Sequence, residues 1–555
     1  MSAVADPFAA RRAVVAAGLL RTFNDIGLLS AADVHVALRL GALAGEDDDA
    51  VRLAVALAVR GPRLGHVFVD LATIRDTANV EADEPVELSM LPWPSPDSWI
   101  VAVGASGLIA VGEDDPAADR PLRLLGTRLY LDRYWREERS VAADLNQLAA
   151  SGRLNVIAGG PGTGKTTRVA QMVAELIEAA AAHGARPPLI ALAAPTGKAA
   201  ARLQEVVHEE RPELDGLHAS TLHRLLGWRP GSQSRFAHHR GNRLPHDVVI
   251  VDETSMVSLS MMARLVEAVR PDARLVLVGD PGQLTSIEAG VVLGDIVGDG
   301  TGSGIVMLAR VHRYGAGIAR VADAIRRGER DEAVAALDDA PGEVTWLRTD
   351  VQESGVGLEL VRERAVAAGL EVAAAARAGD ALQALAALGR FRVLCAHRRG
   401  PYGVSDWTSR IQGWLAADIE DIEQRDYVGR PLLVTENDYE LGLYNGDTGV
   451  IVQSEAGRAS AVFERGRDLL HFSPLRLGAV ETVYAMTVHK SQGSQFDTAA
   501  VLLPSSSSRI LTRELLYTAI TRARRELILV GSEDAVRGAV GRPVARASGL
   551  AERLQ

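Results

Sequence analysis

Residues 159–166 read Gly159-Gly-Pro-Gly-Thr-Gly-Lys-Thr166, and this stretch decides the fold. It fits the phosphate-loop pattern G-x-x-x-x-G-K-[ST], in which glycines let backbone N–H groups surround phosphates. It follows an apolar run, Leu154 to Ala158, that predicts a strand, and precedes a helical pattern from Thr167 to Ala180. This context places phosphates at a helix N-terminus. It disfavours the alternative, a glycine-rich turn with an incidental lysine.

The nucleotide predicted for this loop is ATP with Mg²⁺. The Lys165 ammonium is expected to reach the β- and γ-phosphates, and the Thr166 hydroxyl to ligate the Mg²⁺ ion. The residues expected to surround the phosphates are Gly159, Gly160, Pro161, Gly162, Thr163, Gly164, Lys165, Thr166 and Thr167.

Composition limits the class of protein. The chain has 555 residues, which favours three or four domains, and 47% hydrophobic and 24% charged residues are typical of a globular protein. The net charge of -11 would repel nucleic acid, so any strand contact requires a locally basic groove. The single cysteine, Cys395, excludes an internal disulfide and is expected in a buried strand. No apolar run approaches membrane-spanning length, so we expect no membrane contact and a cytoplasmic location.

The order of elements predicts an α/β fold. Residues 1–90 have mostly helical periodicity, and a proline-rich stretch at 91–96 marks a boundary. Strands are expected at 99–103, 108–111 and 122–131. From 154 to about 330, apolar runs alternate with helical patterns, as in a parallel sheet with crossover helices. Helical segments fill about 330–390, a second alternation begins at Phe391, and short strands at 430–480 predict a small inserted β-barrel.

Two carboxylates end the next predicted strand. The run His246-Asp-Val-Val-Ile-Val-Asp-Glu253 is apolar up to its acidic end. Asp252 can hold the Mg²⁺ that Thr166 also touches, and Glu253 is placed to polarise the attacking water. An apolar strand that ends in two acidic residues also arises by chance. The phosphate loop upstream is what favours a functional role for Asp252 and Glu253.

Further downstream, one amide and one guanidinium are candidates for sensing the γ-phosphate. Gln283 follows the predicted strand 275–279, where a neutral amide could report loss of the phosphate, while Asp280 could be a turn former only. Arg522 lies in a helical pattern far from the phosphate loop. An arginine from a second domain can neutralise charge on the transferred phosphoryl group, which makes domain closure depend on the nucleotide.

Taken together, these motifs resemble the superfamily 1 DNA helicases, and within them the RecD family, the alpha subunits of exodeoxyribonuclease V (RecBCD). The resemblance covers roughly residues 120–530 and is weak before residue 90. The stretches that carry it are residues 159–166, Ala194-Pro-Thr-Gly-Lys-Ala199, Thr221-Leu-His-Arg224, Asp252-Glu-Thr-Ser-Met256, Gly279-Asp-Pro-Gly-Gln283, Val488-His-Lys-Ser-Gln-Gly493 and Tyr517-Thr-Ala-Ile-Thr-Arg522, with further likeness at 128–135, 394–398 and 437–447.

The resemblance implies two RecA-like domains and a motor that moves 5′→3′ on single-stranded DNA, beside RecB-like and RecC-like subunits, in repair of double-strand breaks. The implied domains are residues 1–120 (mainly helical, docking a partner), 121–335 (first RecA-like), 336–429 with 481–555 (second RecA-like) and 430–480 (inserted, SH3-like). It implies that Gln283 and Arg313 sense the γ-phosphate and that Arg522 is the arginine finger. The implied strand-binding residues are Pro195, Thr196, Lys198, Thr221, His223, Thr487, His489 and Ser491.

Several assignments stay open. Thr221 and His223 could instead cap and pack a helix, and Lys490 and Gln492 could contact the nucleotide or a domain hinge. The family has Glu where this chain has Gln495, which removes a charge. It also has an adenine-reading Gln before the phosphate loop; the nearest candidate is Gln147, otherwise a helix surface residue.

Three hypotheses remain for the whole chain. The first is a RecD-like motor subunit, and the second is a stand-alone helicase of the same superfamily, for which the N-terminal region looks short. The third is a scaffold protein that binds ATP structurally, which the presence of every catalytic group disfavours. No nuclease centre is apparent, so we expect any DNA cleavage to reside in a partner.

Overall fold

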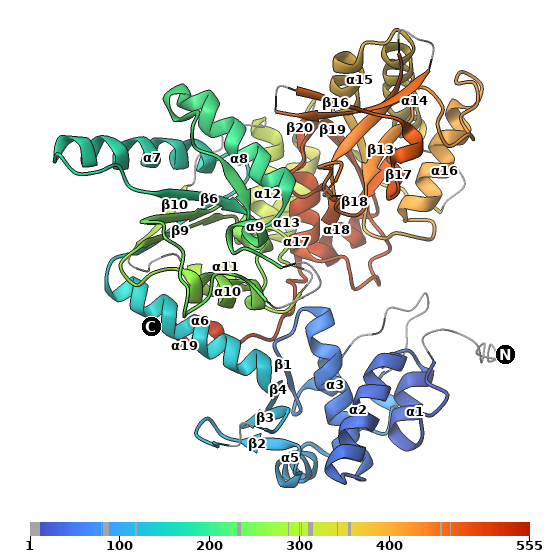
Figure 1. The fold of residues 1–555 in the computed structure, drawn as a ribbon. Coiled ribbons are helices and arrows are strands. Elements are labelled where there is room, and N and C mark those ends of the chain that lie inside the picture. The colour runs from blue at the N-terminus through green and yellow to red at the C-terminus, as the bar shows by residue number, and fades with distance from the viewer. Residues whose placement is uncertain are drawn as a thin grey trace.

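The computed structural model describes residues 12–78, 80, 88–116, 119–229, 235–286, 288–298, 300, 302, 304–308, 315–340, 342–352, 357–438, 440–454, 458–466 and 468–554. Four sheets organise this part of the chain. Figure 1 shows the first parallel sheet with its helices in cyan to green, the second in yellow to red, and the N-terminal region in blue below them. No helix among the described residues combines the length and apolar character required to cross a bilayer.

The first lobe is built on a six-stranded parallel sheet. Its strand order is β10-β5-β9-β8-β6-β7, with β5 Leu154–Gly159, β6 Ile190–Ala194, β7 Ala219–Thr221, β8 Val248–Val251, β9 Arg274–Gly279 and β10 Ile305–Leu308. Successive strand residues point to opposite faces. One face packs on α7 (Lys165–Ala182) and α8 (Gly197–Glu210). The other packs on α6 (Asp132–Ala150), α10 (Leu259–Ala268) and α11 (Val292–Val297).

The second lobe repeats this plan with five parallel strands. The order is β11-β20-β19-β12-β18, with β11 Val344–Leu347, β12 Phe391–Cys395, β18 Ala485–Thr487, β19 Phe496–Leu502 and β20 Ala523–Val530. One face packs on α12 (Ala316–Arg327), α13 (Arg330–Asp338), α17 (Arg513–Ile520) and α18 (Glu533–Val540). The other packs on α14 (Glu359–Arg377) and α16 (Val404–Leu415). Because β11 belongs to this sheet, the alternation begins before Phe391, the expected start.

An antiparallel sheet is inserted between β12 and β18. Its order is β16-β15-β14-β13-β17, with β13 Pro431–Val434, β14 Thr448–Gln453, β15 Ala459–Arg465, β16 Asp468–Phe472 and β17 Val480–Thr482. Short strands were expected over these residues. The insert has a small core of its own, centred on Ile451 and Phe463, which are both about 1% exposed.

The N-terminal region combines helices with a four-stranded sheet. Helices α1 (Gly18–Asp25), α2 (Ala31–Ala44), α3 (Asp49–Arg60) and α5 (Pro96–Ala105) pack beside the sheet β1-β4-β3-β2, whose strands are Phe68–Asp70, Arg128–Leu131, Leu122–Leu125 and Ile109–Val111.

Two strand predictions in this region were wrong in detail. Residues 99–103 are helical, because Pro96 stands at the first helical position, and Trp99 and Val103 bury one helix face while Val101 is 72% exposed. The run expected as one strand over 122–131 is instead the antiparallel pair β3 and β4.

After α18, residues 541–554 leave the second lobe and return to the first; we call this segment the C-terminal strap. The strap ends in α19 (Leu550–Arg553), whose Leu550 is fully buried in the core of the first lobe. The Asn146 amide of α6 donates a hydrogen bond to the Arg553 carbonyl at 3.0 Å. In Figure 1 the red strap runs down to lie beside the cyan helix α6.

Candidate functional site

The phosphate loop connects β5 to α7, as its sequence context predicts. Gly162 and Gly164 have φ angles of 77° and 82°, which L side chains rarely adopt. The Lys165 ammonium donates hydrogen bonds to the carbonyls of Gly159 and Gly160 at 2.7 and 2.8 Å. The lysine therefore lies across the concave face of the loop, where phosphates bind in loops of this kind.

The pair Thr166 and Asp252 fits a Mg²⁺ ion. The Thr166 hydroxyl donates to the Asp252 carboxylate at 3.2 Å, and this carboxylate is buried at the end of β8. A hydroxyl and one carboxylate, completed by substrate phosphates and water, are the ligands that Mg²⁺ prefers in such sites. Among the described residues, no group of three or more His, Cys, Asp or Glu could hold a metal by itself.

Glu253 has an unusual backbone and an unusual environment. Its φ of 52° is rare for a residue other than glycine, and such strain accumulates at functional sites. Burial raises the pKa of the Glu253 carboxyl, and Asp252 raises it further, while Lys165 and Arg522 oppose the shift. The positive charges of both lobes therefore act on one carboxyl group, which is the environment of a general base.

The Gln283 turn is organised by Asp280. One Asp280 oxygen accepts the Gly282 N–H at 2.9 Å, and the other accepts the Gln283 side-chain amide and the Tyr517 hydroxyl, each at 3.1 Å. Asp280 is thus the turn former that the sequence allowed. It also receives a hydrogen bond from the second lobe.

Arg522 lies just after α17 and not within a helix, because α17 ends at Ile520. Its side chain is only 3% exposed. The guanidinium donates to the Thr518 carbonyl at 3.0 Å and to the Ser494 carbonyl at 3.3 Å. The charges of Arg522 and Lys165 both lower the pKa of Glu253, against the effect of its burial.

Further contacts join the lobes beside the nucleotide site. The Leu284 N–H donates to the Thr518 hydroxyl at 2.9 Å, and the Gln492 amide donates to the Leu284 carbonyl at 2.7 Å. A Cβ at Gly160 would lie 2.9 Å from the Tyr517 hydroxyl oxygen, so the phosphate loop lies directly against α17. Of the two roles open for Gln492, the contact between lobes is the one observed.

Tyr517 and Thr518 were missed as site residues. Both belong to the 517–522 motif, from which only Arg522 had been assigned a role. The available signal was spacing: Thr518 and Tyr517 lie four and five residues before that arginine, in the helix that ends just ahead of it.

Three of the expected strand-binding residues lie at the start of α8. Pro195 and Thr196 follow β6, and the Thr196 hydroxyl accepts the Ala199 N–H at 3.2 Å. The Lys198 ammonium crosses to the second lobe and donates to the Ser494 hydroxyl at 2.7 Å. Burial lowers the pKa of Lys198 to about 8.

The other candidates follow β7 and β18. The Thr221 hydroxyl caps α9 (Leu222–Leu225) by accepting the Arg224 N–H at 3.2 Å, which is the structural role the sequence left open. In the second lobe the Thr487 hydroxyl accepts the Lys490 N–H at 3.2 Å, and the Ser491 hydroxyl donates to the Val488 carbonyl at 2.7 Å. Burial lowers the pKa of both His223 and His489. All these groups follow carboxyl ends of parallel strands, where open α/β sheets bind ligands.

Three remaining candidates have different outcomes. The structure does not bring Gln147 to the phosphate loop, because Gln147 lies exposed in the last turn of α6, which leads into the start of β5. The six residues of β5 then span about 20 Å before the loop begins. Arg313 lies outside the described residues. Gln495 accepts a hydrogen bond from the Arg524 guanidinium at 3.4 Å, so a neutral amide, and not a carboxylate, is the acceptor for this cation.

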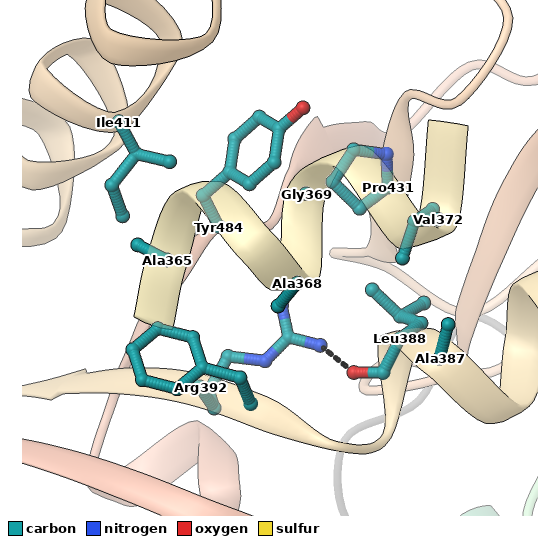
Figure 2. Close-up of a pocket in the computed structure, with 11 residues that line it drawn as sticks. Ala365, Ala368, Gly369, Val372, Ala387, Leu388, Arg392, Ile411, Pro431 and Tyr484 are labelled. Carbon is teal, nitrogen blue, oxygen red and sulfur yellow. Dashed lines mark hydrogen bonds between the residues drawn. The ribbon is translucent and has the colours of Figure 1, made fainter. Parts of the chain in front are cut away.

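A cavity in the second lobe does not compete with this site. Figure 2 shows it between α14, β12 and the start of the insert, with Arg392 among mainly apolar side chains and its guanidinium donating to the Leu388 carbonyl at 3.0 Å. Its volume of about 20 Å³ accommodates little more than one water molecule.

Three family models match successive parts of the chain. A family model described as the RecBCD enzyme subunit RecD, N-terminal domain, matches residues 25–130; an AAA domain model matches 141–349, and a UvrD-like helicase C-terminal domain model matches 482–530. The first match lies largely in the region where the sequence motifs had given little resemblance.

Individual relatives differ in how much of their length they share. The RecBCD enzyme subunit RecD of Mycolicibacterium smegmatis is 50% identical over 576 residues, covering 97% of this chain and 99% of that protein. The ATP-dependent RecD2 DNA helicase of Deinococcus radiodurans is 32% identical over 75% of this chain, but only 52% of its own length is matched. A structure of Bacteroides Pif1 bound to ssDNA has 17% identity and a TM-score of 0.38, covering 71% of this chain and 91% of that one.

Proposed function

The chain belongs to the RecD family of RecBCD enzyme subunits, and we propose that it hydrolyses ATP to move 5′→3′ along single-stranded DNA in a helicase–nuclease complex that processes double-strand breaks. RecB-like and RecC-like subunits are its proposed partners. The 5′→3′ direction and the repair role come from the family resemblance, and the cytoplasm is where such a complex meets its DNA.

The proposed chemistry begins in the first lobe. Lys165 leaves the loop carbonyls and pairs with the β- and γ-phosphates. Thr166 and Asp252 would hold Mg²⁺, which supplies charge neutralisation on the phosphate oxygens. Glu253 takes the proton from the attacking water, because its raised pKa makes it a better base than an ordinary glutamate.

The second lobe completes the site when the lobes close. Arg522 exchanges its backbone carbonyl partners for the charge that develops on the transferred phosphoryl group. The Gln283 amide, held by Asp280, is placed to sense loss of the γ-phosphate. Release of phosphate then weakens the contact between lobes, which couples hydrolysis to movement.

The strand is proposed to cross both lobes at the carboxyl ends of their sheets. The groups around Thr196, Lys198, Thr487 and Ser491 are hydroxyls and one cation, which can bind phosphates without reading sequence. In agreement with the net charge of -11, the cation is confined to a local groove. The insert is the proposed SH3-like module beside this groove, and residues 1–120 are the proposed partner-docking region.

One observation carries the proposal: the phosphate loop of the first lobe lies directly against α17 of the second, and the Tyr517 hydroxyl donates across the lobes to Asp280 at 3.1 Å. The test is Lys165→Gln, which should abolish DNA-stimulated ATP hydrolysis while thermal unfolding stays unchanged. Unchanged turnover would remove the phosphate loop from the mechanism.

The alternative is a stand-alone helicase. The RecD2 helicase, which would favour this alternative, is matched over only 52% of its own length. The Mycolicibacterium smegmatis RecD subunit is matched over 99% of its own length. Purification of the untagged native protein should recover two larger chains in fixed ratio. Efficient unwinding by the isolated chain, with no such partners, would support the alternative.

A further inference from the structure

The C-terminal strap is fastened to both lobes. In the second lobe, the Val544 N–H donates to the Glu514 carboxylate at 2.8 Å, and Arg542 donates to the Ser508 carbonyl at 2.7 Å. In the first lobe, the Gly549 N–H donates to the buried Glu138 carboxylate at 2.9 Å. The strap therefore passes from one lobe to the other on a fixed path.

Arg546 occupies the middle of this path and holds a loop of the first lobe. One guanidinium nitrogen donates to the carbonyls of Ser286, Glu288 and Gly290 at 2.5, 3.2 and 3.5 Å. Burial lowers the pKa of Arg546 to about 10, so the group is still protonated at neutral pH. Three carbonyl dipoles directed at one partly buried cation compensate part of its desolvation.

The same place joins the N-terminal region. A Cβ at Gly65, whose φ is 85°, would lie 2.7 Å from the Arg546 guanidinium carbon, so the arginine packs directly on that glycine. The Gly290 N–H donates to the Gly65 carbonyl at 3.1 Å, and the Ala547 N–H donates to the His66 ring at 3.1 Å. Arg546 is thus fixed from two sides.

The loop that Arg546 holds continues from the nucleotide-sensing turn. It follows Gln283 and Leu284, and Leu284 is bonded to Thr518 and Gln492 of the second lobe. On its other side, the Leu284 carbonyl accepts the Gln492 amide at 2.7 Å, and Gln492 belongs to the segment that also carries the strand-binding candidates His489 and Ser491. One arginine therefore holds the loop after Gln283, and that loop contacts the strand-binding segment of the other lobe.

We propose that Arg546 is a positioning residue that couples the Gln283 turn to the strand-binding segment around His489. Its three hydrogen bonds fix the backbone at Ser286, Glu288 and Gly290, so movement of Leu284 on nucleotide binding is transmitted to the strap and to the second lobe. Without these hydrogen bonds the loop can move by itself, so the Gln283 turn and the strand-binding segment around His489 respond independently. This inference rests on the proposed function, since it concerns the coupling of the same ATPase to the same strand.

The experiment uses the full chain assembled with its partner subunits, and the ATPase rate of the complex that carries Lys165→Gln is subtracted, so that only hydrolysis by this chain is counted. Arg546→Gln should raise the single-stranded DNA concentration for half-maximal ATPase stimulation by about 10-fold, in the range seen when coupling residues are changed. The turnover without DNA and the KM for ATP should stay at the parent values. Arg546→Lys should recover only part of the coupling, because an ammonium cannot reproduce the planar donor geometry.

The matched control is Glu552→Gln, on the same strap. Glu552 is 63% exposed and pairs with Arg128 at 2.7 Å, so its substitution leaves the hydrogen bonds of Arg546 in place. Equal loss of coupling in Glu552→Gln would overturn the proposal, since any weakening of the strap would then suffice. Normal DNA stimulation in Arg546→Gln would overturn it as well.

A second measurement protects the test against misfolding. If Arg546→Gln does not assemble, Arg546→Lys is assayed in its place. Normal DNA stimulation of the ATPase in Arg546→Lys would show that the planar guanidinium is not required and would overturn the proposal. Activity retained in Lys165→Gln would instead refute the proposed ATPase itself, whatever Arg546 does.

Discussion

The two lobes share one architecture and carry different chemistry. Each is a parallel sheet with helices on both faces, and the phosphate loop and the acidic pair Asp252 and Glu253 both belong to the first. The second presents Arg522, Tyr517 and Gln492 from segments that adjoin the first lobe. The proposed catalytic site, divided in this way, is complete only when the lobes meet, and the proposal therefore makes hydrolysis sensitive to whatever controls their approach.

The largest expected effect comes from removing the contribution of the second lobe. Arg522→Ala should lower ATP turnover by about 1,000-fold while ATP still binds, because arginine fingers act on the transition state. Turnover with saturating DNA and binding of a fluorescent ATP analogue measure the two quantities. Arg524→Ala, an exposed neighbour, is the control and should be near normal. A rate close to the parent's in Arg522→Ala would assign the finger elsewhere.

Removing the base of the first lobe should have the next largest effect. Glu253→Gln should reduce turnover by about 100-fold with ATP binding retained, as expected for loss of general base catalysis. The pKa of Glu253 is raised above the 4.5 of an ordinary glutamate. As the pH falls, turnover of the parent protein should therefore decline at a higher pH than protonation of an ordinary glutamate would require. A pH–rate profile tests the sign; an acid limb that is unchanged in Glu253→Gln would contradict the assignment.

A smaller effect should follow from cutting one contact between the lobes. Tyr517→Phe removes the hydroxyl that donates to Asp280, a hydrogen bond to a charged group, and should lower DNA-stimulated turnover by about 10-fold. Tyr427→Phe provides a matched control, because the Tyr427 hydroxyl contacts Tyr484 inside the second lobe. If both variants behaved alike, the contact between lobes would have no special part.

The strand groove should show a modest pH dependence. The pKa of Lys198 is lowered to about 8, so its positive charge is present below that pH and is lost as the pH rises through it. Affinity for single-stranded DNA should therefore fall by about 3-fold between pH 7 and pH 9, as for loss of one phosphate contact. Lys198→Arg should flatten this profile in an anisotropy titration. A fall that persists unchanged in Lys198→Arg would come from another group.

The smallest effect is expected at Gln147. Because this residue lies at the other end of β5 from the phosphate loop, Gln147→Ala should leave the KM for ATP and the preference for ATP over GTP unchanged. Steady-state assays with both nucleotides measure this. A clear loss of adenine preference would show that α6 rearranges to bring Gln147 to the base.

The sequence predicted best what is encoded locally. The phosphate loop, the strand ending in Asp252 and the helix after Lys165 each lie within about twenty consecutive residues, and all are found where expected. Residues 99–103 were misassigned because Trp, Ile and Val favour strands, whereas Pro96 and the burial of one helix face determine the structure. The resemblance of the N-terminal region to the family was missed because amphipathic helices preserve a hydrophobic pattern but few identical residues.

The contacts between segments distant in the chain could not be predicted. Leu284 meets Thr518, Gly160 meets Tyr517, and Arg546 meets Gly290 only because two separate sheets and a returning strap bring them together. No periodicity encodes such encounters. Motif positions identified the catalytic candidates, and packing determined which of their neighbours join the lobes.

The burial of Leu550 has a consequence for synthesis of the protein. This side chain fills the first lobe's core, yet the ribosome adds it after the whole second lobe has been made. The emerging first lobe must therefore wait with part of its apolar surface uncovered, at a stage when nascent domains are prone to aggregate. Its maturation is thus a late event, and chaperones have a long interval in which to bind it.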